Sequence, residues 1–298
     1  MDVSIVVTTF QRQALLDLCL RSLRDQRNRH GRTEIVVVDN CPQGSARELC
    51  ERHRHEFEPA GIGFKYVNET RPGISHGRNR GIEETQHEII CWIDDDEEAQ
   101  PGWLDRLTAP FVEIGPSVAM VGGEVEPNFG DASRPSWLVD ELLHAFSCRW
   151  GWDTEPRFLD GHEWFGEGNC AIRRSVLGDR RFRTDLGRSG GALGGSEGIV
   201  YLELRAAGHA AYYAPDAKVS HFVHPDRLNQ RWLLNRMLQA GISDARAHRF
   251  SPLNSNVLNI KIHLPSIAGL DPESMDPKGL TQLSMAYYQT GYAFGRHL

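Results

Sequence analysis

The sequence predicts an α/β protein with a mostly parallel sheet, flanked by helices and followed by a C-terminal helical extension. Short β-rich runs alternate with amphipathic helical stretches through the first half of the chain, and polar residues follow each predicted strand there. Strand–helix alternation implies a parallel sheet covered on both faces. Ligands bind such sheets beside the carboxyl ends of the strands.

Four strands and three helices are expected in the first half. The strands are the runs VSIVVTTF, EIVVVDN, FKYVNE and EIICWID, which are rich in β-branched and aromatic residues. An apolar stripe at helical spacing predicts the first helix over residues 14–26. The next two helices are expected over 45–55 and 75–85, with Ser45 and Ser75 as N-caps.

The second half is less regular. Strands are expected at VAMVGGEVEP, NCAIRR and AAYYAPDAKVSHFV, and helices over residues 196–209, 227–249 and 280–295. Between them, Trp137, Trp150, Trp152 and Trp164 lie in a segment with several prolines and glycines. These tryptophans either form a surface for a ring-shaped ligand or fill gaps in the core.

Bulk composition narrows the class of protein. The chain has 298 residues with a formal net charge of -7, which argues against a nucleic-acid-binding protein. Its six cysteines include no CxxC pair, so neither a zinc site nor a disulfide framework is indicated. The N-terminus lacks the pattern of a signal peptide, and no apolar run reaches the roughly 18 residues of a membrane span. We therefore expect a cytoplasmic protein.

The run CWIDDDEEAQPGW, residues 91–103, ends a buried strand in five consecutive acids. Mg²⁺ and Mn²⁺ take oxygen ligands, and alternate residues of a strand point to the same side. Asp94 and Asp96 could therefore share a metal site while Asp95 points away. Glu97 and Glu98 are expected to face solvent. The alternative is a solvated acidic turn.

The segment NETRPGISHGRNRGI, residues 68–82, combines three arginines with three glycines just before a helix. Glycines allow close approach of the backbone to a ligand, and a helix N-terminus with nearby arginines suits phosphate. Arg71, Arg78 and Arg80 could therefore meet a diphosphate. A Gly-Pro turn followed by a basic helix face is the alternative.

The motifs VSIVVTTFQR, EIVVVDN, RPGISHGRNRGI and IDDDE occur in the order and spacing of family 2 glycosyltransferases, which have the GT-A fold, and the chain resembles that family over about its first two-thirds. The resemblance implies a nucleotide-sugar donor and a divalent cation, Mn or Mg. Thr9 and Asp39 match the positions that hold the nucleobase, Asp94 matches the residue near the ribose and diphosphate, and Asp96 matches the cation ligand. The remaining implied donor-site residues are Arg12, Arg71, Arg78, Asn79 and Asp95. Trp164, Gly168 and Asn169 are implied to line the donor-sugar and acceptor pocket.

The catalytic base is where the chain departs from the family pattern. The family usually shows glycines, then Glu-Asp, then a helix ending in R-x-x-G, whereas this chain has GGSEGIVYLELRAAG. Alignment on RAAG places Glu197 at the base position. The other register would place Gly198 there and leave no base. His221 is the candidate for a second metal ligand, with a surface histidine as the alternative.

The expected reaction is a single displacement with inversion at the anomeric carbon, in which Glu197 accepts the proton of an acceptor hydroxyl. A UDP- or dTDP-sugar is the expected donor, and a glycan, lipid-linked or small-molecule acceptor remains open. A catalytically degenerate sugar- or nucleotide-binding protein is the first alternative. A nucleotidyltransferase is disfavoured because TTFQRQ stands where a glycine-rich, lysine-containing loop is needed.

We divide the chain into a nucleotide-sugar-binding half (1–125), an acceptor-binding half of the same domain (126–225) and a C-terminal helical region (226–298). The basic helix over 227–249 either lies on an anionic membrane surface or packs on its own domain. The first alternative would make the protein peripheral to the inner face of the membrane. The C-terminal tail either covers the core or pairs with another subunit in a homo-oligomer.

Overall fold

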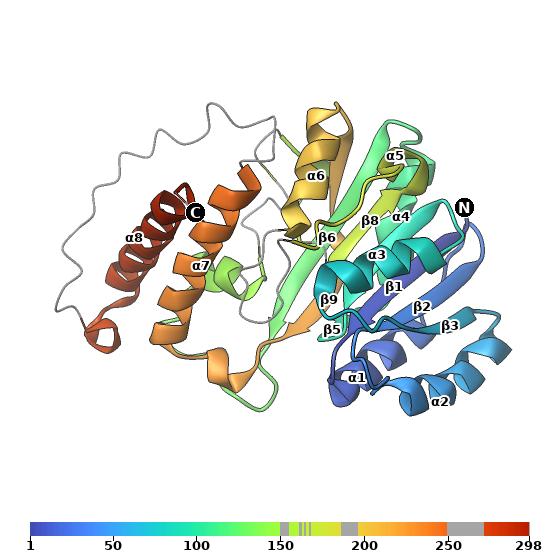
Figure 1. The fold of residues 1–298 in the computed structure, drawn as a ribbon, viewed down its shortest axis with the longest axis horizontal. Coiled ribbons are helices and arrows are strands. Elements are labelled where there is room, and N and C mark those ends of the chain that lie inside the picture. Colours follow the sequence, from blue (N-terminus) through green and yellow to red (C-terminus); the bar gives the residue numbers. More distant parts are fainter. Residues whose placement is uncertain are drawn as a thin grey trace.

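The computed structural model describes residues 1–149, 155–160, 163, 165–166, 168–185, 196–248 and 271–297. Over these residues it contains one nine-stranded sheet in the order β3-β2-β1-β4-β8-β6-β9-β5, with β7 paired to β9 (Figure 1). The strands are β1 (Val3–Thr9), β2 (Thr33–Asp39), β3 (Gly63–Asn68), β4 (Ile89–Asp94), β5 (Glu97–Ala99), β6 (Val118–Asn128), β7 (Arg157–Phe158), β8 (Asn169–Arg173) and β9 (Ala210–Phe222).

The α/β prediction is confirmed, and the first four predicted strands are parallel neighbours. β1 lies between β2 and β4, and β3 extends the sheet beyond β2. β8 then pairs antiparallel with both β4 and β6, and the short β5 pairs antiparallel with β9. The sheet is therefore mixed where the chain pattern loosens, and parallel where strands and helices alternate.

Helices cover both faces of the sheet (Figure 1). They are α1 (Gln13–Arg24), α2 (Arg47–Phe57), α3 (Ile74–Glu84), α4 (Trp103–Glu113), α5 (Arg174–Leu177), α6 (Ser196–Ala206), α7 (Gln230–His248) and α8 (Pro277–Gly295), with 3-10 turns at Glu58–Ala60, Asp140–Phe146, Pro225–Arg227 and Pro272–Ser274. The predicted N-caps are wrong. Ala46 precedes α2, and Gly73 precedes α3 with a φ of 127° that suits glycine.

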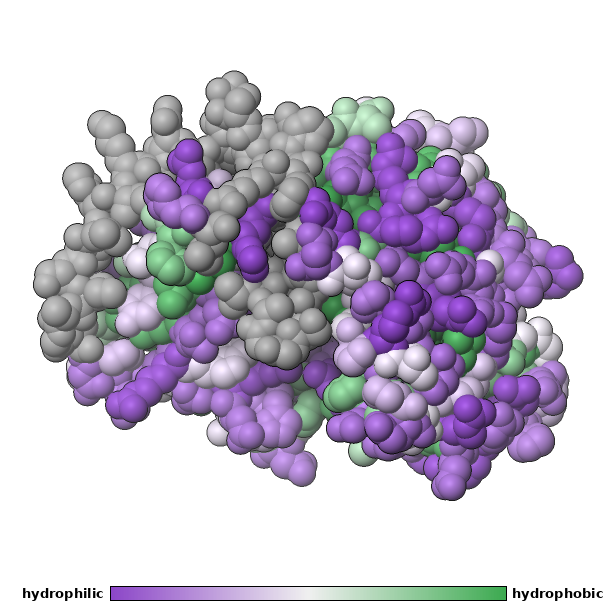
Figure 2. Space-filling model, viewed as in Figure 1, coloured by the Kyte–Doolittle hydropathy of each residue, from purple (hydrophilic) through white to green (hydrophobic). Residues whose placement is uncertain are grey.

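Alternation along the strands divides the core into two layers. Val7 of β1 packs with the layer that includes α1, α2 and α4, whereas Val6 packs with the layer that includes α3 and α6. Burial on both faces explains why these strands are nearly continuous apolar runs. Figure 2 shows that the outer face over the first half of the chain is mainly hydrophilic.

The C-terminal helices α7 and α8 lie side by side at one end of the molecule (Figure 1). Leu233 of α7 is fully buried, and the Trp232 ring lies 4.9 Å from the Phe146 ring. These apolar residues face the domain, which favours the packed-helix interpretation over a membrane-facing one. Within the described residues, no helix has the length and apolar character needed to cross a membrane.

Candidate active site

The carboxyl ends of the parallel strands bring the predicted polar residues together. Thr9 is the register partner of Asp39, and Asp39 is the partner of Asn68. On the other side of β1, Thr8 is the partner of Asp94. The polar ends of four strands therefore form one continuous edge, as the alternating pattern predicts.

Arg12 lies at the centre of the acidic cluster. Gln11 turns the chain after β1 with a φ of 53°, and Arg12 occupies the N-cap position of α1. Its Nη1 atom donates to Asp95 Oδ1 at 3.0 Å and to Asp96 Oδ2 at 2.9 Å. Thr9 Oγ1 donates to the other oxygen of Asp95 at 2.7 Å. The Asp95 carboxylate therefore faces the end of β1 and the loop that follows, where it accepts hydrogen bonds from Thr9 and Arg12.

Asp96 also approaches His221 from a distant strand. The antiparallel pairing of β5 with β9 makes Glu97 the register partner of His221, and the Phe222 amide donates to the Asp96 carbonyl at 2.8 Å. This pairing brings His221 Nε2 to 3.7 Å from Asp96 Oδ2. The His221 ring is buried, and its Nδ1 lies 3.4 Å from Cys148 Sγ. The predicted metal pair is thus close in space.

Burial and mutual repulsion set the protonation of the cluster. Desolvation raises the pKa of Asp95 to about 6, although the positive charge of Arg12 opposes the rise. Burial also disfavours ionised Asp96, but His221 and Arg12 outweigh this effect and lower the Asp96 pKa. The two neighbouring carboxyls therefore have pKa values that are shifted in opposite directions.

Glu97 contradicts the sequence prediction that it faces solvent. It is only 4% exposed, and its Oε2 accepts a hydrogen bond from the Asp94 amide at 3.1 Å. Burial first, then the charges of Asp94 and Asp96, raises the pKa of Glu97 well above its usual range. Glu97 lies in β5, which forms by pairing with β9, and the alternation of β5 turns Glu97 and Ala99 inward and leaves Glu98 half-buried.

Gly168 lies against the same carboxyls. A methyl group added to its Cα would lie 2.7 Å from Glu97 Oε1 and 2.9 Å from Asp94 Oδ2. Only glycine allows this approach without a shift, so the predicted pocket residue Gly168 does contact the acidic cluster.

Arg78 is the buried cation on the other side of Asp94. Its Nη2 lies 3.3 Å from Asp94 Oδ1, and its guanidinium lies 5.6 Å from the Phe182 ring centroid. Asn79 has different partners, because its side chain donates to the Phe182 carbonyl and accepts from the Phe182 amide, both at 2.8 Å. Asn79 therefore holds the segment that packs on Arg78, and its predicted contact with the donor would require a change of partner.

The two other arginines of the 68–82 segment form local ion pairs. Arg71 makes a bidentate pair with Glu69, in which both N–O distances are 2.8 Å, and this pair lowers the pKa of Glu69 to about 2. Arg80 pairs with Glu84 in the last turn of α3 at 2.5 Å. Arg71 stays exposed at the strand-end edge, whereas Arg80 points along α3 toward its C-terminus.

Asp39 organises the loop after β2. Its side chain is 0% exposed and accepts from the backbone amides of Cys41 at 3.0 Å and Ala46 at 2.7 Å, and from the Tyr66 hydroxyl at 3.0 Å. Phe10, which follows Thr9, is 48% exposed. The sequence interpretation missed Phe10, although an aromatic residue in the loop after the first strand was a visible signal for stacking on a base.

Asn169 does not line a pocket, which corrects the sequence prediction. It is 0% exposed, its Oδ1 accepts from Trp103 Nε1 at 2.8 Å, and its Nδ2 donates to the carbonyls of Glu124 at 2.9 Å and Ala217 at 2.8 Å. Its amide is committed to α4, β6 and β9 because it joins these elements behind Gly168.

The candidate base and one pocket residue are less fully described. Glu197 is the second residue of α6, but its side chain lies outside the described residues, as does Trp164. The position of α6 itself is defined: the Tyr201 hydroxyl donates to the Glu163 carbonyl at 2.8 Å, and Arg205 Nη2 donates to the Leu159 carbonyl at 2.9 Å. These two bonds fix the helix to the segment after β7.

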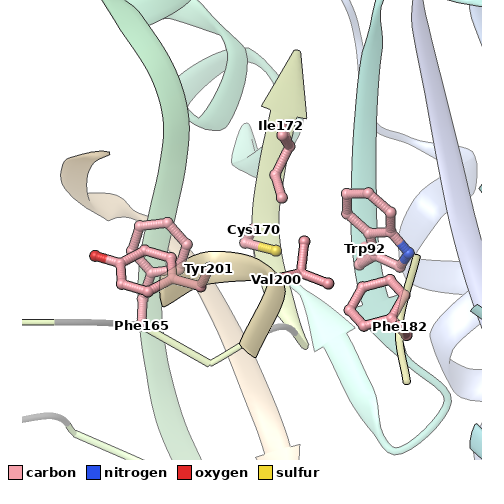
Figure 3. A pocket seen from close by; sticks show the side chains of 7 residues that line it. All are labelled: Trp92, Phe165, Cys170, Ile172, Phe182, Val200 and Tyr201. Carbon is pink, nitrogen blue, oxygen red and sulfur yellow. The ribbon is translucent and has the colours of Figure 1, made fainter. Parts of the chain in front are cut away.

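A small apolar cavity lies between α6 and the sheet (Figure 3). Its volume is about 10 Å³, and its lining residues are Trp92, Phe165, Cys170, Ile172, Phe182, Val200 and Tyr201. A volume of this size holds at most one water molecule. The cavity is therefore a packing gap beneath α6 and is too small to hold a nucleotide.

The residues present suit a hard divalent cation. A carboxylate oxygen of Asp96 and an imidazole nitrogen of His221 are ligand types that Mn²⁺ accepts, and the side chains are only 10% and 7% exposed. Within the described residues, no group of three or more His, Cys, Asp or Glu side chains could hold a metal ion. A cation here would therefore take its remaining ligands from water or from a bound phosphate.

A Rossmann-like sheet with carboxylates and arginines at its strand-end edge defines an enzyme that binds an anionic nucleotide. Known proteins agree with this class. The model of glycosyl transferase family 2 matches residues 4–181, and the chain belongs to this family. It is a glycosyltransferase that uses a nucleotide-sugar donor, and its fold is the GT-A type.

Two relatives in sequence cover most of the chain. The succinoglycan biosynthesis protein ExoM of Rhizobium meliloti (strain 1021) is 29% identical over 251 residues, which are 83% of this chain and 75% of that protein. The glucosyl-dolichyl phosphate glucuronosyltransferase of Haloferax volcanii is 27% identical over 216 residues, which are 70% of this chain and 65% of that protein.

Solved structures show the same fold at lower identity. The mannosyltransferase PcManGT from Pyrobaculum calidifontis, in complex with GDP-Man and Mn²⁺, has a TM-score of 0.58 and 18% identity, over 99% of this chain and 73% of that one. S. aureus TarS 1-349 in complex with UDP-GlcNAc has a TM-score of 0.56 and 14% identity, over 100% of this chain and 91% of that one.

Proposed function

We propose that this glycosyltransferase inverts the anomeric centre and depends on a divalent metal. The observation that carries the proposal is the approach of His221 Nε2 to Asp96 Oδ2, 3.7 Å apart, at the strand-end edge where Arg12 and Arg78 also lie. Two metal-type ligands with little solvent exposure, beside two cations, would form a site for a metal and a diphosphate together.

The strand-end residues would divide the donor between them. Phe10 offers an exposed ring on which the base stacks, and Asp39 fixes the loop after β2. Arg71 and Arg78 supply positive charge for the diphosphate. Asp94, held by Arg78, accepts from the ribose hydroxyls. The nucleotide would therefore cross the sheet edge from β2 to β4.

Asp96 and His221 would hold the cation. A bound Mn²⁺ or Mg²⁺ offsets the charge that develops on the departing nucleoside diphosphate. Arg78 contributes to the same stabilisation as a fixed charge that needs no reorganisation during the reaction.

Glu197 would act as general base from the first turn of α6. It accepts the proton of the acceptor hydroxyl as that oxygen attacks the anomeric carbon from the face opposite the diphosphate. The bonds from Tyr201 and Arg205 hold α6 against the segment after β7, which gives the base a fixed frame.

The acceptor we propose is a lipid-linked glycan. Support comes from the relatives, because one is named for a dolichyl phosphate acceptor and another, from Campylobacter jejuni, for GalNAc(5)-diNAcBac-PP-undecaprenol. The candidate nucleotides of the donor are UDP, dTDP and GDP. GDP is included because PcManGT binds GDP-Man, and TarS binds UDP-GlcNAc. Thermal-shift screening of these nucleotides with and without Mn²⁺ identifies the base.

Two variants test metal use and catalysis separately. Asp96→Ala should abolish metal-dependent turnover of the donor, while Asp105→Ala, which removes a carboxylate paired with Arg29 on the surface, should not. Glu197→Gln should stop transfer while donor binding stays nearly intact, and Glu203→Gln is its control on the same helix. Full activity of Glu197→Gln would remove Glu197 as the base.

A further inference from the structure

One guanidinium nitrogen serves two carboxylates in the candidate metal site. Arg12 Nη1 lies 3.0 Å from Asp95 Oδ1 and 2.9 Å from Asp96 Oδ2. Within the described part of the chain, these two carboxylates are the only hydrogen-bond partners of the Arg12 side chain. Asp95 and Asp96 are almost fully buried, so their charges need a cation nearby.

The same oxygen of Asp96 faces both Arg12 and His221. Asp96 Oδ2 is 2.9 Å from Arg12 Nη1 and 3.7 Å from His221 Nε2. A metal ion held by Asp96 and His221 would therefore meet the positive charge of Arg12 at close range. Like charges separated by a few ångströms in a partly buried site repel strongly.

Arg12 is the solvent-accessible member of this cluster. Its side chain is 44% exposed, it follows the turn at Gln11, and it lies at the start of α1 rather than inside the helix. A long arginine side chain at such a position can swing toward solvent, where the donor diphosphate would lie, and guanidinium binds phosphate oxygens in bidentate fashion.

We propose that Arg12 is the resident counter-cation of the acidic cluster and is exchanged on substrate binding. In the free enzyme it neutralises Asp95 and Asp96. When metal and nucleotide bind, Arg12 leaves Asp96 to the metal and transfers its contact to the diphosphate. The inference rests on the metal-dependent function proposed above and adds which residue balances the charge of Asp95 and Asp96 before the substrates bind.

Exchange predicts opposite effects on the two ligands. Removing the charge of Arg12 with Arg12→Gln should strengthen the binding of Mn²⁺ alone by about tenfold, because the competing cation is gone. The same variant should weaken the binding of UDP at saturating Mn²⁺ by about tenfold, because the diphosphate loses a partner. A merely structural arginine would weaken both ligands together.

The experiment measures free Mn²⁺ by electron paramagnetic resonance in the absence of nucleotide, and UDP by calorimetry in the presence of Mn²⁺, with dTDP or GDP in its place where the wild type prefers it. Arg24→Gln is the matched control, since Arg24 is 46% exposed on the same helix and pairs with Glu56 outside the site. It should change neither affinity.

Loss of Arg12 leaves the buried Asp95 without its cation, which could destabilise the fold. A second variant therefore removes the charge of Asp95 as well. Arg12→Gln with Asp95→Asn leaves Asp96 and His221 in place, and should show the same gain in Mn²⁺ affinity. Mn²⁺ binding that is weaker or unchanged in both variants overturns the inference alone. Absence of Mn²⁺ binding in the wild type and both variants, with and without UDP, overturns the proposed metal-dependent function as well.

Discussion

Glu97 is a buried acid that lies beside two other acids, Asp94 and Asp96. It accepts from the Asp94 amide and lies beside Gly168, while Asp94 and Asp96 disfavour its ionised form. Its burial follows from the inward alternation of β5 and from close packing against the backbone of Gly168. The cluster therefore contains two carboxyls, Asp95 and Glu97, whose pKa values are raised above their usual range.

Replacement of Glu97 by glutamine should make stability less sensitive to pH. Because the pKa of Glu97 is raised in the folded state, its ionisation costs stability as the pH rises above about 4.3, its unfolded value. Glutamine has no proton to lose. The free energy of unfolding of Glu97→Gln, relative to that of the wild type, should therefore rise by ~1 kcal/mol or more between pH 5 and pH 7.5. Urea unfolding without metal measures this difference.

Glu98→Gln is the control for that experiment. Glu98 neighbours Glu97 on β5 but is half-buried on the opposite side of the strand. Its variant should follow the wild type at both pH values. A Glu97→Gln variant that is less stable than the wild type at pH 7.5 would show that the ionised carboxylate is the form the fold requires.

Gly168→Ala should damage the site without unfolding the protein. The added methyl group would lie within 3 Å of the Glu97 and Asp94 carboxylates, so at least one of them must move. We expect a loss of donor binding and activity of about tenfold or more, since a shift of about 1 Å in a catalytic constellation has that cost.

Gly63→Ala in β3 is the matched change for Gly168→Ala. Its added methyl group meets Glu34 Cβ at 3.2 Å, on a strand end remote from the acids. Calorimetry of nucleotide binding and donor turnover, with a melting curve for each variant, separates a local effect from a global one. Equal activity of Gly168→Ala and wild type would contradict the close packing of this site.

At the scale of elements, α6 depends on a segment that precedes it by many residues. Tyr201 donates to the Glu163 carbonyl at 2.8 Å, and its ring meets the Phe165 ring edge-on with a centroid distance of 5.1 Å. Because Glu197 lies one helical turn before Tyr201, the anchor fixes the part of α6 that carries the proposed base.

Tyr201→Phe should reduce kcat several-fold while donor affinity stays near the wild-type value. The change removes one hydrogen bond, worth about 1 kcal/mol, and keeps the ring contact with Phe165. Tyr212→Phe, on β9 with its ring against Phe158, is the control with the same atom removed. Steady-state kinetics with metal and donor saturating would reveal the effect, and a change in donor affinity alone would argue that α6 serves binding.

Strands were predictable from sequence in both halves of the fold, since the expected runs VAMVGGEVEP, NCAIRR and AAYYAPDAKVSHFV match β6, β8 and β9. The antiparallel pairing of β8 and the short β5 were not predicted. Buried apolar runs and strand-end polar residues are local signals, and they located β1 to β4 together with Thr9, Asp39 and the acids after β4. The short β5 has no local signature, since its three residues become a strand only by pairing with β9. The burial of Glu97 was missed for that reason.

Asn169 shows the same limit inside the site. Its sequence context resembles a pocket segment, but its amide is committed to three elements that come together only in the folded chain. The opposite case is His221. The family resemblance suggested it as a metal ligand together with Asp96, and the pairing of β5 with β9 brings the two side chains close together. Contacts between distant strands thus decided which predicted residues can reach a ligand.

At the scale of the whole molecule, the candidate metal site joins strands that are far apart along the chain. Asp96 follows β4, and His221 lies near the end of β9. A ligand that binds both residues holds these strands together, and it stabilises the folded state by an amount that grows with the logarithm of its concentration relative to its Kd. Metal binding should therefore be visible as a global increase in melting temperature.

His221→Gln should fold but lose this stabilisation. Removal of the imidazole leaves Asp96 as the one ligand of the proposed pair, so we expect Mn²⁺ affinity to fall by about tenfold and the Mn²⁺-dependent rise in melting temperature to shrink accordingly. His224→Gln is the control, because His224 is exposed and faces Asp226 at 3.4 Å. Melting curves over a Mn²⁺ titration, with and without nucleotide, give both affinities. An unchanged Mn²⁺ response in His221→Gln would leave Asp96 and the diphosphate as the metal ligands, and β9 would then contribute only its pairing with β5.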